Sequence, residues 1–317
     1  VRISLPDGKT IVADSGSPDG DLALLSHAHG DHLYVDPPEE VIASDVTHAL
    51  AAKRRSETRT PDRTGDPDVE PFDSGHVPGS RAFLVEADRR YLYTGDVSVR
   101  DRFFLDGFSP PSADVLIVES TYGRPEYTFP PQEEVEATIV DWLEDTADTP
   151  VLLMGYALGR AQELQVLADR ADRNRIFVTD AIEQIDQVLE ETTAATFRRE
   201  SYSADVTLRA GDALVLPSQT NYLDFVERIR ERTGALKAGF SGWAVDDSYR
   251  FARDLDVSVP LSDHCDFEEL LSLIEAVDPA VVYTVHGFVD ELAQAITTEL
   301  GYPSQSLKPN QTTLSEF

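Results

Sequence analysis

The chain has 317 residues, of which 41% are hydrophobic and 27% are charged, so it holds enough apolar material for one large domain or two of ordinary size. No window approaches eighteen consecutive apolar residues, and no basic-then-apolar leader opens the printed sequence. We therefore expect a globular, cytoplasmic protein without a membrane partner. The single cysteine, Cys265, excludes an intrachain disulfide framework and a thiolate zinc cluster, and we expect it to be a small buried thiol.

The net charge is −31, because 58 Asp and Glu residues stand against 27 Lys and Arg residues. An acidic surface with few lysines is typical of a protein adapted to high salt, where the Debye length is only about 3 Å at 1 M. The alternative is a low-salt protein that repels polyanions. In salt the charge is screened, so the acidic composition does not exclude a nucleic-acid substrate.

The first 120 residues alternate short β-like runs with turns, at residues 2–14, 22–32 and 41–45, and a polar Pro- and Gly-rich loop covers 58–71. Residues 81–96 predict a hairpin that turns at Asp88-Arg89, and 115–120 is a short apolar strand. A helix is expected over 133–144, and a strand, a tight glycine turn and a helix over 151–171. Strands near 176–178 and 214–216 and helices near 182–189 and 223–230 continue an α/β alternation. Helix, strand and helix follow over 266–300.

The strongest chemical signal is the segment Ser26-His27-Ala28-His29-Gly30-Asp31-His32, which follows an apolar run. Because His27 and His29 are two residues apart, both imidazoles of a strand tip project from the same face. Asp31 and His32 follow in the turn and are expected to face a second ion beside the first. Three histidines and one aspartate within six residues favour zinc or another first-row divalent cation.

Two later segments supply further ligand types. His76 stands between glycines in GHVPGS, and Asp96 ends the strand-like run RRYLYTGD, where a carboxylate is able to bridge two cations. Taken alone, a histidine in a glycine loop is more often solvated, and an aspartate after glycine is more often a turn residue. Their combination with the first cluster favours a site. His264 and His286 also lie in loop-like segments, whereas we interpret His48 as a residue on a helix face.

The order of these segments resembles, almost end to end, the metallo-β-lactamase-fold nucleases of the β-CASP group. Four segments match the family's first four motifs: IVADSG with Asp14, SHAHGDH, GHVPGS with His76 and TGD with Asp96. Three more resemble motifs A, B and C: VESTYG with Glu119, SDHCDF with His264 and VHGF with His286. YALGRAQEL resembles a signature of the inserted β-CASP domain. The HxHxDH element alone also occurs in thioesterases, lactonases and β-lactamases, and the later motifs narrow the resemblance to nucleases.

The resemblance implies two divalent metal ions, zinc or alternatively manganese. One ion is assigned to His27, His29 and His76, the other to Asp31, His32 and His286, with Asp96 bridging them. Asp31, His264 and Glu119 are the implied catalytic residues. His264 resembles the general acid that protonates the leaving oxygen, and Glu119 orients it and raises its pKa. Asp14 is expected to position histidine ligands without binding an ion itself.

The implied fold is a four-layer αββα metallo-β-lactamase sandwich, built from residues 1–124 and 244–317. Residues 125–243 form an inserted, compact α/β β-CASP domain that caps the metal cleft. Three residues are expected to contact substrate: Arg160 at the start of a helix would meet a phosphate, and Tyr122 and Trp243 would stack on a base. Core or interface packing is the alternative for both aromatic residues.

The implied function is a dinuclear-metal nuclease, and the strings ESTYGRPEYTFPP, GYALGRAQ, FSGW and LSDHCDF resemble the short ligase-associated DNA exonucleases. We therefore expect an exonuclease that acts on single-stranded or end-containing DNA in repair. The first alternative is an RNA-processing nuclease related to mRNA 3′-end-processing factors, since a histidine at motif C is associated with RNA-acting members. Less favoured alternatives are a thioesterase or lactonase and a non-catalytic scaffold subunit. A homodimer, or partners in repair or processing, are left open.

Overall fold

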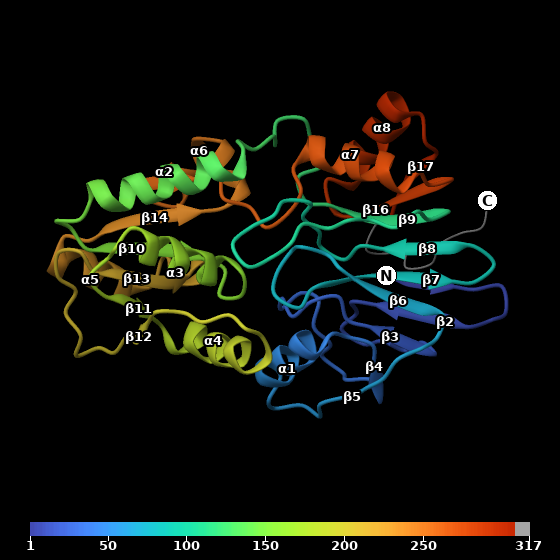
Figure 1. The fold of residues 1–317 in the computed structure, drawn as a ribbon, viewed down its shortest axis with the longest axis horizontal. Coiled ribbons are helices and arrows are strands. Elements are labelled where there is room, and N and C mark those ends of the chain that lie inside the picture. The colour runs from blue at the N-terminus through green and yellow to red at the C-terminus, as the bar shows by residue number, and fades with distance from the viewer. Residues whose placement is uncertain (308–317) are drawn as a thin grey trace. The chain divides into compact units, whose positions relative to one another are not determined.

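The chain forms two compact units, seen in a computed structural model that describes residues 1–307 (Figure 1). Unit 1 comprises Val1–Tyr127 and the segment that begins at His264, and unit 2 comprises Thr128–Asp263. Residues 308–317, which the sequence assigned to the first domain, lie outside the described residues. The chain therefore leaves unit 1 after Tyr127 and returns to it at His264.

Unit 1 contains a three-stranded sheet, a six-stranded sheet and a two-stranded sheet. The first has the order β1-β2-β3, formed by Arg2–Ser4, Thr10–Ala13 and Leu22–Leu24. The second has the order β17-β16-β9-β8-β7-β6, formed by Ser304–Ser306, Val281–Gly287, Val115–Ser120, Arg90–Tyr93, Arg81–Glu86 and Val69–Asp73. The third pairs β4 (Glu40–Val41) with β5 (Asp62–Arg63). The helices of unit 1 are α1 (Asp45–Arg54), α7 (Phe267–Val277), α8 (Val289–Ala295) and the short η3 (Ile296–Leu300).

The six-stranded sheet is buried on both faces, which explains why its central strands have continuous apolar runs rather than an alternating pattern. In β7, Ala82 and Leu84 belong to the core that contains α7 and α8, whereas Phe83 and Val85 belong to the core shared with β1, β2 and β3. The two-residue period of a strand separates these two sets. A helix layer and a second sheet therefore pack on opposite faces of this sheet.

Helix α1 supplies the fourth layer, at the end of unit 1 opposite α7 and α8 in Figure 1. Ser44 caps it by accepting a hydrogen bond from the Thr47 amide at 3.0 Å. The Ser44 and Thr47 hydroxyls both donate to the Gly79 carbonyl, at 2.6 and 2.8 Å. The start of α1 is thereby bound to the loop that follows His76. The arrangement is the predicted αββα sandwich.

Unit 2 is built around one six-stranded sheet in which every pair of strands is parallel. Its order is β12-β11-β13-β10-β14-β15, formed by Glu200–Ser201, Ile176–Val178, Ala213–Pro217, Val151–Gly155, Leu236–Phe240 and Val257–Val259. Its helices are α2 (Gln132–Asp145), α3 (Arg160–Arg170), α4 (Asp180–Thr192), α5 (Asp224–Thr233) and α6 (Ser248–Ala252), with the short η1 (Ser218–Thr220) and η2 (Gly242–Val245).

The division between the units differs from the predicted domain boundaries. The second junction lies between Asp263 and His264, twenty residues after the expected boundary at 243/244. The reason is β15, which pairs in parallel with β14 and so extends the sheet of unit 2 to Val259. The first junction lies at Tyr127/Thr128, three residues after the expected position.

The secondary structure expected from periodicity is largely confirmed. The hairpin at Asp88-Arg89 joins β7 to β8 with Glu86 opposite Arg90, and the helix expected over 133–144 lies within α2. The expected strand, glycine turn and helix are β10, Gly159 with φ of 87°, and α3. In residues 1–307, the helices are all too short or too polar to cross a membrane.

One carboxyl group of unit 2 is buried in the contact between α3 and α4. Asp186 has no exposed surface, and its Oδ1 accepts hydrogen bonds from Gln162 at 2.6 Å and Gln165 at 3.3 Å. Arg199 Nε lies 3.3 Å from Oδ2. Burial raises the pKa of Asp186 to about 6, because loss of hydration outweighs these polar contacts.

The stability of unit 2 should depend on pH through this group. Because the folded pKa lies above the ordinary value of 3.8, the folded state keeps a proton that the unfolded chain has released between pH 3.8 and about 6. The stability contributed by Asp186 therefore falls as pH rises through this window, by about 3 kcal/mol in total. Both tryptophans, Trp142 and Trp243, lie in unit 2, so urea unfolding followed by tryptophan fluorescence reports on this unit.

We expect the wild type to lose stability relative to Asp186→Asn from pH 4 to pH 7 at constant high salt. The unfolding free energy of the wild type minus that of the variant should therefore decline over this range. The variant has no carboxyl at this position, so the other titrating groups cancel in the comparison. Parallel stability curves for the two proteins would contradict the raised pKa.

Candidate metal centre and catalytic site

The histidine cluster follows the buried strand β3 and its continuation through Leu25. His27 is fully buried, and its ring centroid lies 4.7 Å from that of His29 and 4.7 Å from that of His76. His27, His29, His76 and Asp96 each offer one donor atom, and these four atoms all lie within 4.8 Å of one another. The structure thus brings together three histidines and one aspartate from three separate segments of unit 1.

The loop that carries His76 depends on two glycines with positive φ, Gly75 at 70° and Gly79 at 82°. A Cβ atom on Gly75 would lie 2.2 Å from the Ser98 carbonyl oxygen. The loop is also held from outside, since Arg102, which is 1% exposed, donates through Nη2 to the carbonyls of Gly75 at 2.6 Å and His76 at 2.7 Å. The segment GHVPGS therefore has little freedom to move His76.

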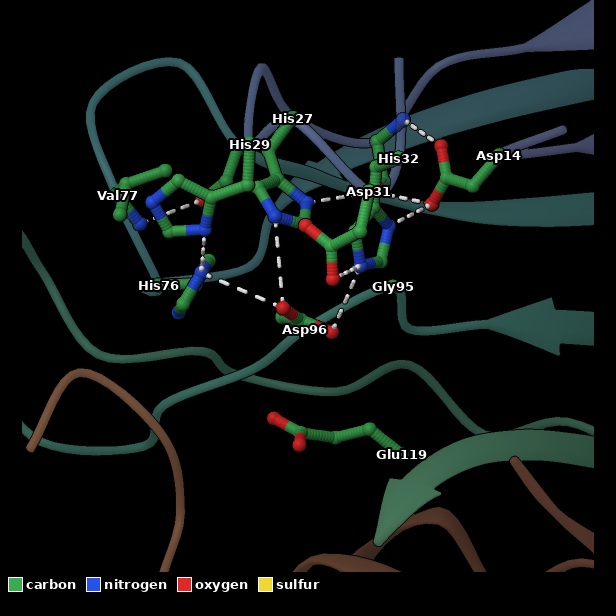
Figure 2. A network of polar contacts seen from close by, with 12 residues as sticks. Asp14, His27, His29, Asp31, His32, His76, Val77, Gly95, Asp96 and Glu119 are labelled. Carbon is green, nitrogen blue, oxygen red and sulfur yellow. Dashed lines mark hydrogen bonds and ion pairs between the residues drawn. The ribbon is translucent and has the colours of Figure 1, made fainter. Parts of the chain in front are cut away.

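Asp96 lies at the centre of the cluster, three residues after the end of β8. Figure 2 shows three imidazoles that converge on its carboxylate. The Nε2 atoms of His27, His32 and His76 lie 3.4, 3.5 and 3.5 Å from its oxygens. Burial raises the pKa of Asp96 to about 6, against the opposing charge of His32. A cation between these groups would remove this penalty, because it favours the ionised carboxylate.

Asp14 lies beside the cluster and contacts one of its histidines. Its carboxylate accepts hydrogen bonds from the Ser26 amide at 2.7 Å, the Ser26 hydroxyl at 2.5 Å and the Tyr93 hydroxyl at 2.7 Å. The same carboxylate lies 2.9 Å from Nδ1 of His32. This contact fixes the Nδ1 proton of His32 on the side of Asp14 and directs Nε2 to Asp96.

Two of the expected ligands lie beside His32 at the border of the cluster. The side chain of Asp31 is 82% exposed, and its Oδ2 is 3.9 Å from His32 Nε2. His286 lies at a bulge of β16 with φ of 56°, and its ring centroid is 5.3 Å from that of His32. Both therefore lie on the His32 side of the cluster.

The implied catalytic pair is also assembled. His264 Nδ1 lies 2.7 Å from Oε1 of Glu119, at the end of β9, and the His264 ring centroid is 4.5 Å from that of His76. Glu119 is 1% exposed and also accepts from the Val97 amide at 2.9 Å. Burial disfavours its charge, but the charge and hydrogen bond of His264 hold the pKa of Glu119 below its ordinary value.

The donor set fits a divalent cation. His27 Nε2 is buried and has no hydrogen-bond partner among residues 1–307, although it points into the cluster. Burial and the neighbouring histidines lower the pKa of His27 well below its ordinary value, so the ring is neutral and offers a lone pair. Imidazole nitrogens and carboxylate oxygens are the ligands that zinc binds in hydrolytic sites.

The structure differs from the sequence at the expected substrate contacts. The guanidinium of Arg160 is buried and bonded to Glu163 and Asp263, so it does not face a phosphate. Tyr122 is 3% exposed, with its ring centroid 5.9 Å from that of His264, so it offers little surface for stacking. Trp243 is half-buried in η2. Core packing, the alternative considered for the aromatic residues, describes Tyr122 better.

Two other expectations concern residues outside the cluster. Cys265 is a buried free thiol, as predicted, and burial raises its pKa well above the ordinary value. His48 lies in α1, where Nε2 is 2.8 Å from the Pro61 carbonyl oxygen. This contact lies outside the histidine cluster, so a substitution of His48 is a suitable control for substitutions in the cluster.

Sequence analysis assigned no role to Ser26, Tyr93 or Arg102, although all three hydrogen-bond to Asp14 or to the loop of His76. Ser26 opens the motif SHAHGDH and Tyr93 directly precedes TGD, and a search for buried donors to Asp14 would have found them. No sequence signal indicates Arg102, because its partners are backbone carbonyls of a distant loop.

We expect the wild-type protein to bind divalent zinc, and His27→Ala to lose at least tenfold in affinity because the buried donor at the centre of the set is removed. His48→Ala is the matched control and should bind zinc like the wild type. Metal content after dialysis and isothermal titration measure both. Equal zinc binding by His27→Ala and the wild type would contradict the assignment.

We expect Tyr93→Phe to weaken metal binding by about tenfold, because Asp14 loses a hydrogen bond and orients His32 less well. Tyr93 is fully buried and the substitution preserves its ring, so the fold should persist. Zinc titration combined with circular dichroism checks both statements. A variant that folds and binds zinc with unchanged affinity would show that this hydroxyl does not position the site.

Comparison with known proteins shows which proteins the chain is similar to. Residues 257–306 match the family described as a Zn-dependent metallo-hydrolase RNA specificity domain. A probable DNA ligase of Opitutus terrae is 32% identical over 287 residues, which cover 86% of this chain and 27% of that protein. Endoribonuclease ysh-1 of Neurospora crassa is 32% identical over 151 residues, covering 46% of this chain and 16% of that protein.

A third relative is the cleavage and polyadenylation specificity factor subunit 3 of Dictyostelium discoideum, 29% identical over 211 residues, which cover 53% of this chain and 27% of that protein. The chain thus spans about a quarter or less of the length of these three curated relatives. The chain is therefore similar over most of its length to part of a protein named a probable DNA ligase, and residues 257–306 match a Zn-dependent metallo-hydrolase domain.

Proposed function

We propose that the chain is a nuclease that hydrolyses nucleic-acid phosphodiesters with two divalent cations, zinc or alternatively manganese. The observation that carries this proposal is the position of the Glu119–His264 pair beside the cluster of His27, His76 and Asp96. Asp96, Glu119 and His264 each have a donor atom within 4.8 Å of the others. A site for cations therefore adjoins a histidine that is able to hold and donate a proton.

The ligand sets proposed for the two ions are those expected from the sequence. His27, His29 and His76 would hold one, Asp31, His32 and His286 the other, and Asp96 would lie between them. When bound, two such cations lower the pKa of an attacking water and neutralise charge on the phosphate. The donor atoms of the first set lie close together, whereas the residues of the second set are more widely spaced. The support for the first ion is therefore more direct than the support for the second.

His264 is proposed to protonate the leaving oxygen. Its Nδ1 faces Glu119, and we assign the transferred proton to Nε2 on the other side of the ring. The buried carboxylate of Glu119 stabilises the protonated ring and fixes its orientation, with the Val97 amide holding the carboxylate in turn. General acid catalysis of this kind contributes about 10²- to 10⁴-fold to a rate.

We propose an exonuclease at DNA ends as the preferred activity. Similarity over 86% of the chain to a protein named as a probable DNA ligase supports a role at DNA ends. The second candidate is RNA processing, which is supported by the match to an RNA specificity domain and by the relative named an endoribonuclease. Both candidates use the same site residues. Trp243 is retained as a proposed stacking contact.

The test compares end-labelled single-stranded DNA with RNA of the same sequence in high salt, with zinc and manganese added separately. We expect stepwise shortening of the DNA, and loss of at least 100-fold in rate for His264→Ala and Asp96→Ala. His48→Ala serves as the control with wild-type rate. Preference for RNA would establish the second candidate. Metal-bound protein that cleaves neither substrate but hydrolyses a nitrophenyl ester would contradict the proposed nuclease.

The role of His264 makes a more specific prediction. A nitrophenolate leaves without protonation, whereas the alkoxide of a nucleotide needs a proton. His264→Ala should therefore lose at least tenfold more rate on an oligonucleotide than on bis-nitrophenyl phosphate. An equal loss on the two substrates would assign His264 to another task.

A further inference from the structure

Arg160 is a buried cation at the first position of α3, and its guanidinium is surrounded by acceptors of unit 2. Nε donates to Glu163 Oε2 at 2.9 Å, and Nη2 lies 2.9 Å from Asp263 Oδ1. Nη1 donates to the Phe240 carbonyl at 3.1 Å and also to the Leu261 carbonyl. A guanidinium offers five donors in a rigid plane and keeps its charge, so this network has a fixed geometry.

These bonds join the start of α3 to the end of β14 and to the segment 261–263. Two of these four acceptors, the Leu261 carbonyl and the Asp263 carboxylate, belong to that segment. Asp263 is followed directly by His264. The backbone that leads into the proposed general acid is therefore held by one side chain from a helix about one hundred residues earlier.

The neighbouring strand leaves space for this side chain. Gly155 ends β10, and a Cβ atom there would lie 2.8 Å from Arg160 Cγ and 2.9 Å from Leu164 Cδ1. The chain has a tight turn with φ of 87° at Gly159, immediately before Arg160. The segment GYALGR thus provides the space and the tight turn that the Arg160 side chain needs. It does not form an open phosphate site.

The residues after Asp263 are held in unit 1. The Cys265 amide donates to the Val97 carbonyl at 2.8 Å, and His264 Nδ1 contacts Glu119. His264 is therefore flanked in sequence by two anchored points. The imidazole has to stay oriented for proton donation, because small displacements of a catalytic group cost large factors in rate.

We propose that Arg160 is a positioning residue for His264, acting through its bonds to Leu261 and Asp263. This rests on the proposed function, in which His264 protonates the leaving oxygen. Arg160 itself contacts no reacting atom. Its removal should reduce proton donation in particular, in addition to any general loss of stability.

The test is Arg160→Lys, in which a single ammonium replaces the planar group and is unable to reach all four acceptors. The matched control is Arg173→Lys. Arg173 is 2% exposed in unit 2, and its guanidinium donates to the carbonyls of Leu143, Thr146, Thr149 and Asp212, far in sequence from His264. Asp263→Asn is a second variant that weakens the same anchor with less change in volume.

We expect Arg160→Lys to lose at least tenfold more rate on an oligonucleotide than on bis-nitrophenyl phosphate, the same leaving-group dependence as His264→Ala. Arg173→Lys should affect both substrates equally. Hydrogen–deuterium exchange of the peptide 261–266, which needs no metal or substrate, should be faster in Arg160→Lys and unchanged in Arg173→Lys.

Equal losses on both substrates, or unchanged exchange of this peptide in both Arg160→Lys and Asp263→Asn, would overturn the proposal. If the wild type cleaves neither DNA nor RNA, the proposed function fails. In that case faster exchange confined to the Arg160 and Asp263 variants would still establish the anchor, and unchanged exchange would reject it.

Discussion

The site depends on one electrostatic constraint, the burial of carboxylates among imidazoles at the ends of strands. Asp96, Glu119 and Asp14 lie in surroundings where an ionised group is costly unless it is paired. Each is surrounded by donors: imidazoles around Asp96, His264 and an amide around Glu119, and Ser26 and Tyr93 around Asp14. Each loop of the site has to bring a hydrogen-bond donor to one of these three carboxylates, and this requirement restricts the conformation of the loop. The turns at Gly75 and Gly79 and the contacts of Arg102 serve the same requirement from the backbone side.

The sequence predicted the parts of the site that lie in short, dense motifs. Residues 26–32 and the segments around His76, Asp96, His264 and His286 are local patterns, and their composition alone indicates metal binding. It did not predict Tyr93 or Arg102, because their partners are far away in sequence or are backbone atoms. Arg160 shows the opposite error. A basic residue at the start of a helix suggested an anion site, but burial decided its role, and burial depends on packing that a local pattern does not contain.

The fold was predicted at the level of layers and less well at its junctions. Continuous apolar runs such as 115–120 indicated strands buried on both faces, and the cores on either side of β7 have this arrangement. The second junction between the units differs from the expected boundary because β15, with only three residues at the edge of a parallel sheet, belongs to unit 2. So short a strand has no readable period, and its membership is set by pairing with β14. The sheet of unit 2 therefore ends only five residues before His264.

The interrupted order of unit 1 has a consequence for protein synthesis. Strand β16 pairs with β9 in the large sheet, and His264 and His286 come from the part of the chain made after unit 2. A nascent chain that still lacks this part has most of the expected metal ligands but neither the proposed acid nor the strand beside Glu119. Under the proposed function, the chain would complete its catalytic site only after translation has passed residue 287.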